Sequence, residues 1–189
     1  MLKRLSLTAA VFITASAPAF AHLDPAEHGS FLAGVTHPFS GLDHILAMVA
    51  VGLWAAQMSG RALWAVPAAF VSTMALGFGA ALAGVSLPSV EPAILASIVA
   101  LGLLVAMAVR VPLPVSSAVV SVFALFHGFA HGSELGAAGA LSFGLGFVVA
   151  TALLHAAGIG LGVMIGRRMG FSRMLGAFTA LAGVALIFA

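Results

Sequence analysis

Long apolar stretches recur along almost the whole chain and are separated by short polar breaks. These stretches cover roughly residues 31–58, 62–84, 91–110, 114–134, 138–165 and 172–189. Each is close to the roughly 20 residues that a helix needs to cross a hydrocarbon layer about 30 Å thick. The pattern predicts an all-α, polytopic membrane bundle of six transmembrane helices. Because the connections are too short to hold a soluble domain, we expect residues 22–189 to form a single bundle.

The first 21 residues are typical of a cleaved signal peptide rather than of a span. Residues 1–4 form a basic segment with Lys3 and Arg4, residues 5–15 form a short apolar run, and residues 19–21 read Ala-Phe-Ala, which is typical of a cleavage site. Cleavage after this site makes His22 the first residue of the mature chain. It also places the mature N-terminus on the far side of the membrane.

The distribution of arginine predicts the orientation independently. With the mature N-terminus outside, the breaks after the first, third and fifth spans lie inside the cell. These breaks hold every basic residue of the mature chain, namely Arg61, Arg110, Arg167, Arg168 and Arg173. Such a bias is the positive-inside pattern. With six spans, the N-terminus and the C-terminus are both expected on the periplasmic side of a bacterial inner membrane.

Composition narrows the chemistry that the chain can perform. Hydrophobic residues make up 62% of the chain and charged residues 6%, whereas soluble domains carry about a quarter charged residues. The net charge of +2 is not gathered in a cluster, so no nucleic acid partner is expected. The chain has no cysteine, which excludes thiolate metal sites and disulfides and leaves His, Asp and Glu as ligands.

Two rows of glycines predict close helix packing. They are spaced by four residues and consist of Gly128, Gly132 and Gly136 in one row and Gly158, Gly162 and Gly166 in the other. In lipid, rows of small residues let helix backbones approach each other closely. Such packing leaves little room for a wide aqueous pore and suits a small ion better than a bulky solute.

The end of the fourth span carries the clearer of two ionisable groups. His127 and His131 are four residues apart, so they share one face of a helix, and Glu134 follows three residues later. Two imidazoles and a carboxylate suit divalent Ni, Co, Zn, Cu or Fe, and not Ca or Mg. The alternative is that these histidines only hydrogen-bond backbone carbonyls or bridge helices. Ionisable groups in lipid are costly, so we favour metal ligation.

The start of the first span carries the other group, His37 to His44. On a straight helix these two histidines would lie about 10 Å apart, too far to share an ion. Pro38 and Gly41 predict a bend that brings them together. Asp43 between them is either a metal ligand or part of a capping box in which Ser40 caps the helix.

Topology predicts that the two groups meet. The first span runs inward and the fourth outward, so both groups lie near the outer surface. His155, in the fifth span, is expected deeper and is a candidate for a second station. His22 and His28, in the polar segment after the cleavage site, are further candidates for metal capture, although an ordinary polar tail explains them equally well.

At these motifs the sequence resembles the HupE/UreJ family of bacterial nickel permeases over essentially its whole length. The resemblance rests on His37-Pro38 through Asp43-His44-Ile45-Leu46-Ala47-Met48, and on Phe126-His127-Gly128 through His131-Gly132-Ser133-Glu134. It implies uptake of Ni2+, with Co2+ as a second cargo. It also implies metal roles for His37, Asp43, His44, His127, His131 and Glu134.

The preferred hypothesis is therefore a permease, not an enzyme, with the metal ion and the lipid bilayer as its partners. No Gly-Lys-Ser/Thr phosphate loop is present, so transport does not use ATP by that route. One alternative is an intramembrane hydrolase that holds catalytic Zn2+ with the same ligands. Another is a haem protein, which the closeness of His127 and His131 on one helix disfavours. The sequence is compatible with a homo-oligomer but does not determine the oligomeric state.

Overall fold

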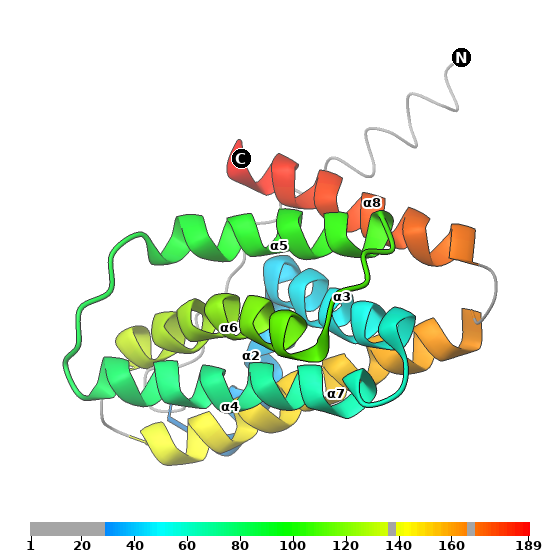
Figure 1. Cartoon of the computed structure of the whole chain (residues 1–189). Helices are drawn as coiled ribbons and strands as arrows, with labels where there is room; N and C mark the ends of the chain where they lie inside the picture. Colours follow the sequence, from blue (N-terminus) through cyan, green and yellow to red (C-terminus); the bar gives the residue numbers. More distant parts are fainter. Residues whose placement is uncertain (1–28, 136–138, 166–168) are drawn as a thin grey trace, which may run out of the picture.

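The chain folds into a bundle of helices, shown in Figure 1. A computed structural model describes residues 29–135, 139–165 and 169–189. Within these ranges all regular structure is helical, in the order α2 (Phe31–Ser40), α3 (Leu42–Met58), α4 (Ala62–Leu82), α5 (Val90–Ala106), α6 (Leu113–Leu135), α7 (Ala140–Ile165) and α8 (Met169–Ile187). The predicted spans agree with these helices to within a few residues, except that the first is divided into α2 and α3.

Four of these helices, α4, α6, α7 and α8, are long and apolar enough to cross a membrane. The pair α2 and α3 qualifies as a fifth span if it is taken as one helix broken by a bend of 85°. Helix α5 is apolar but has only 17 residues, a length of about 25 Å. The chain is thus a multi-pass membrane protein, although α5 is shorter than the predicted span. The predicted signal peptide, residues 1–21, lies outside the described residues.

The break between α2 and α3 lies at Gly41. Helix α2 begins after Ser30, whose side chain accepts a hydrogen bond from the Ala33 N–H at 3.0 Å, and it continues through Pro38. The prediction that Ser40 caps the second helix is wrong. Ser40 is the last residue of α2, and its hydroxyl donates to the Thr36 carbonyl at 3.2 Å. Extended backbone at Gly41, with φ −104° and ψ 123°, makes the bend instead.

Glycines bring helix backbones into contact in several pairs of helices. A Cβ atom on Gly128 of α6 would collide with the backbone of α4. Gly52 of α3 and Gly158 of α7 face each other in the same way, as do Gly102 of α5 and Gly176 of α8. Figure 1 shows α5 and α8 running side by side along one edge of the bundle. The close packing that the glycine rows predict is confirmed, and only the last glycine of each row lies outside the described part of the chain.

Hydrogen bonds join three helix ends at one end of the bundle. The Gln57 amide of α3 donates to the Val105 carbonyl of α5 at 3.0 Å and to the Ser172 hydroxyl of α8 at 2.9 Å. The Arg173 Nε–H donates to the Ala106 carbonyl at 2.7 Å. The ends of α3 and α5 and the start of α8 therefore lie together, as a bundle with alternating helix directions requires.

The outer surface of the bundle is apolar. Large hydrophobic side chains on several helices stay exposed, including Leu76 at 70%, Leu141 at 77%, Met164 at 86% and Leu181 at 69%. Exposed apolar surface on this scale marks an interaction site in a soluble protein. On helices of this length and hydropathy it is the surface that faces lipid.

Glycine packing predicts opposite outcomes for two neighbouring substitutions in α7. Gly158→Ala places a methyl group against the Val49 carbonyl of α3, whereas Gly160→Ala places it in open space. We expect Gly158→Ala to destabilise the protein by about 1–3 kcal/mol. We expect Gly160→Ala to leave stability unchanged or to raise it by up to about 1 kcal/mol through helix propensity.

Thermal unfolding of the two purified variants in the same detergent measures both effects. Equal losses of stability for the two variants would contradict backbone contact between α3 and α7.

Candidate metal centre

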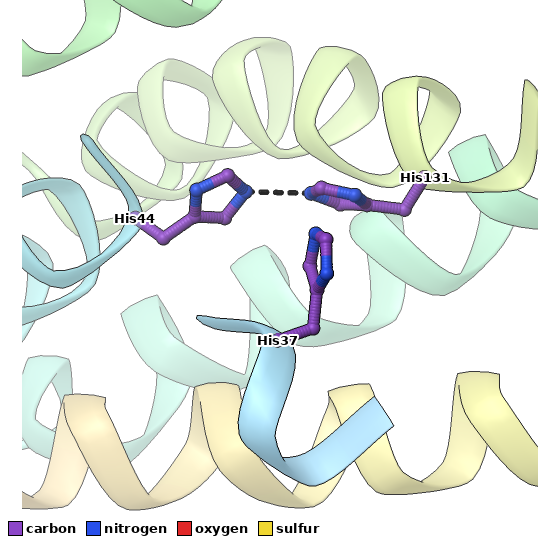
Figure 2. A group of neighbouring side chains, drawn as sticks. All are labelled: His37, His44 and His131. Atoms are coloured by element: carbon purple, nitrogen blue, oxygen red, sulfur yellow. Dashed lines mark hydrogen bonds between the residues drawn. The ribbon is translucent and has the colours of Figure 1, made fainter. Parts of the chain in front are cut away.

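Three histidines from three helices converge inside the bundle. His37 of α2, His44 of α3 and His131 of α6 each offer a ring nitrogen, and these nitrogens all lie within 4.8 Å of one another. Figure 2 shows the His44 and His131 rings pointing at each other, with the His37 ring directed toward the space between them. We call these three residues the His triad.

Distances within the triad are those of a compact site. The Nε2 atoms of His44 and His131 lie 2.6 Å apart. The ring centroid of His37 lies 4.5 Å from that of His131 and 5.9 Å from that of His44. Three imidazoles at this spacing suit a divalent transition metal such as Ni, Co or Zn, which accepts nitrogen ligands readily.

The break at Gly41 explains how His37 and His44 come together. An unbroken helix would separate them by about 10 Å, whereas the bend of 85° brings their rings into contact. A Cβ at Gly41 would lie 2.5 Å from Asp43 Oδ1 and 2.8 Å from His44 Nδ1, so a larger residue there would displace these two side chains. The expectation that a bend near Gly41 unites the two histidines is confirmed.

Two carboxylates lie behind the triad. Asp43 Oδ1 lies 2.9 Å from His44 Nδ1, and Glu134 Oε2 lies 3.6 Å from His131 Nδ1. Neither Nδ1 atom has a hydrogen-bond partner within the described residues, so each carboxylate is a close neighbour of its ring and not its hydrogen-bond acceptor. Neither carboxylate belongs to the group of atoms within 4.8 Å of one another.

The surroundings of the triad differ on its two sides. Phe147 of α7 packs its ring 4.6 Å from that of His131, and Phe143, one turn earlier, packs 5.6 Å from His37. His131 is buried, whereas the side chain of Glu134 is 68% exposed. The triad thus has an apolar wall on α7, and the exposed Glu134 lies beside it. Sequence reasoning missed this wall, although the two phenylalanines share one helical face.

His127 lies outside the triad. Its ring is fully buried, its Nδ1–H donates to the Phe123 carbonyl at 3.0 Å, and its centroid lies 5.7 Å from that of His44. His155 is 1% exposed and packs its ring 5.0 Å from that of Phe70. The remaining candidates, His22 and His28, lie outside the described residues.

Comparison with known proteins agrees with the motifs. Residues 9–186 match a protein family described as HupE / UreJ protein. The chain is also similar to "Protein HupE" of Rhizobium leguminosarum bv. viciae, with 48% identity over 174 residues that cover 90% of this chain and 91% of the relative. No solved structure matches this chain.

The geometry of the triad predicts a specific cross-link. His44→Cys combined with His131→Cys places two thiols within reach of a short bifunctional reagent, and the chain has no other cysteine to interfere. With a protease site inserted in the exposed connection between α4 and α5, we expect the two fragments to stay joined after cleavage.

A matched pair, His44→Cys with Met174→Cys, serves as the control because Met174 is exposed on α8. Its fragments should separate. Separation of the first pair, with both thiols reactive to a monofunctional label, would contradict the contact between α3 and α6.

Proposed function

Because this chain belongs to the HupE/UreJ family, we propose that it is a permease that carries Ni2+, and as a second cargo Co2+, into the cell. The observation that supports this best is the His triad, which gathers three imidazoles from separate helices of a membrane bundle. In this proposal the protein is a transporter and not an enzyme. The bacterial inner membrane is its location.

The ligand set favours the proposed cargo over other abundant cations. Imidazole nitrogen binds Ni2+, Co2+ and Zn2+ well, whereas Ca2+ and Mg2+ prefer sites made only of oxygen. In the proposal His37, His44 and His131 contact the ion directly. Asp43 and Glu134 lie beside two of these rings and attract the cation through their negative charge.

The proposed orientation places the triad near the periplasmic surface. His44 lies near the start of α3 and His131 near the end of α6. The opposite end of the bundle holds Arg61, Arg110 and Arg173, and a positive-inside bias assigns that end to the cytoplasm. Both termini are then periplasmic, and ions arriving from outside reach the triad first.

The membrane potential supplies a driving force without ATP. Moving two charges inward across about 100 mV releases about 4.6 kcal/mol. That favours accumulation of a divalent cation inside the cell. Proton coupling is not needed to account for inward movement.

The triad predicts a loss of uptake for His131→Ala. We expect nickel accumulation to fall about tenfold or more, because one imidazole is removed and the Nε2 of His44 loses its partner. The measurement uses cells without their own nickel importers, at matched amounts of protein in the membrane, with Zn2+ and Co2+ as competitors.

Ser133→Ala is the matched control for this experiment. Its hydroxyl is exposed and, among the described residues, donates to the Ala130 carbonyl of the same helix, so uptake should stay at the wild-type level. If wild-type protein fails to raise nickel in the cell, the proposed function is wrong.

Acid should inhibit uptake. An imidazole must be neutral to bind a metal, and histidine in water takes up a proton as the pH falls through about 6.5. We expect initial uptake rates in proteoliposomes to decrease as the outside pH is lowered below this value at a clamped membrane potential. An uptake rate that rises with acidification would argue against histidine as the ligand.

A further inference from the structure

Two buried histidines outside the triad have ring nitrogens that make no hydrogen bond with any described residue. His155 is 1% exposed, and neither its Nδ1 nor its Nε2 has a hydrogen-bond partner within the described ranges. The Nε2 of His127, which is 0% exposed, is also without a partner there. Buried polar atoms are almost always hydrogen-bonded, so three such atoms in one part of the bundle require an explanation.

These two histidines share a common neighbour. The ring of Phe70 packs 5.7 Å from that of His127 and 5.0 Å from that of His155, measured between centroids. Phe70 itself is fully buried. His127 of α6 and His155 of α7 therefore face the same region around α4.

Other polar atoms line this region. On α7, Thr151 lies one turn before His155 and is fully buried, and its hydroxyl donates to the Met74 sulfur at 3.6 Å. Met74 lies one turn after Phe70 on α4 and is also fully buried. Imidazole nitrogen, a hydroxyl and a thioether are donors of the kind that a borderline transition metal accepts.

The distance of this region from the triad, measured along the helix axes, follows independently from α7 and from α3. On α7, His155 follows Phe147, which packs against the triad, by eight residues, or about 12 Å. On α3, Gly52 packs against the His155 carbonyl and follows His44 by eight residues, again about 12 Å. His127 lies between the triad and His155, about 6 Å from His131 along the axis of α6.

We propose that His127 and His155 form a second, inner binding station for the transported divalent transition-metal cation. This inference rests on the proposed function. It divides the two histidines of α6 between two sites, with His131 serving the triad and His127 the inner station. The ion then passes from the triad to the inner station in steps of about 6 Å, toward the end of the bundle that holds Gln57.

Nickel binding to the purified full-length protein tests the proposal. In equilibrium dialysis we expect wild-type protein to bind about two Ni2+ ions per chain and His155→Asn about one. We also expect His155→Asn to lower nickel uptake about tenfold at matched membrane levels. The control is Ser97→Ala, a fully buried residue of α5 whose hydroxyl bonds the Ile94 carbonyl, and it should match wild type in both assays.

The outcomes separate this proposal from the function on which it rests. If wild-type protein carries nickel and His155→Asn matches it in both assays, the inner station is wrong and the permease stands. If wild-type protein neither binds nor carries nickel, the proposed function itself fails.

Crystals of wild-type protein soaked in Ni2+ test the station without any substitution, should His155→Asn fail to fold. An anomalous difference peak between His127 and His155, distinct from a peak at the triad, supports the proposal. A single peak at the triad, with water between the two lower histidines, overturns it.

Discussion

Direct contact between helix backbones is the constraint on which the arrangement of this bundle depends. In lipid no hydrophobic force drives helices together, so packing at short range must do so. Gly34 of α2 lies against the Phe143 carbonyl of α7, and Gly146 of α7 lies against the Phe31 carbonyl of α2. This reciprocal contact fixes the short helix α2 on α7. It thereby fixes His37, which would otherwise sit on a ten-residue helix with few other anchors.

The sequence predicts most of the fold because hydropathy and helix length act locally. The helix boundaries and the meeting of the two histidine groups follow from span order and from Pro38 and Gly41. The exact residue of the break does not follow, because Ser40 carries a good capping side chain but continues α2. The roles of His127 and His131 also escape a sequence argument. They share one helical face, and only the rotation of α6 against α3 decides which ring reaches His44.

In the proposed permease, the placement of charge at the site suits release of the bound ion. Asp43 and Glu134 lie behind imidazole rings, and ring nitrogen atoms face the centre. A site with carboxylate or thiolate directly on the ion would hold it more tightly. Conduction requires binding that is favourable enough for entry and weak enough for exit. In the proposed function, a site of imidazoles without thiolate, and with its carboxylates outside the group of ligand atoms, is compatible with both requirements.

The short contact between His44 and His131 has a mechanical consequence. A metal bound at about 2.0–2.1 Å to each of two tetrahedral imidazole ligands needs their nitrogens about 3.4 Å apart. The two Nε2 atoms are 2.6 Å apart. In the proposed function, an ion shared by the two rings therefore requires the rings to rotate or to move apart by roughly 0.8 Å. Because the rings belong to α3 and α6, loading of the proposed site is coupled to the packing of these two helices.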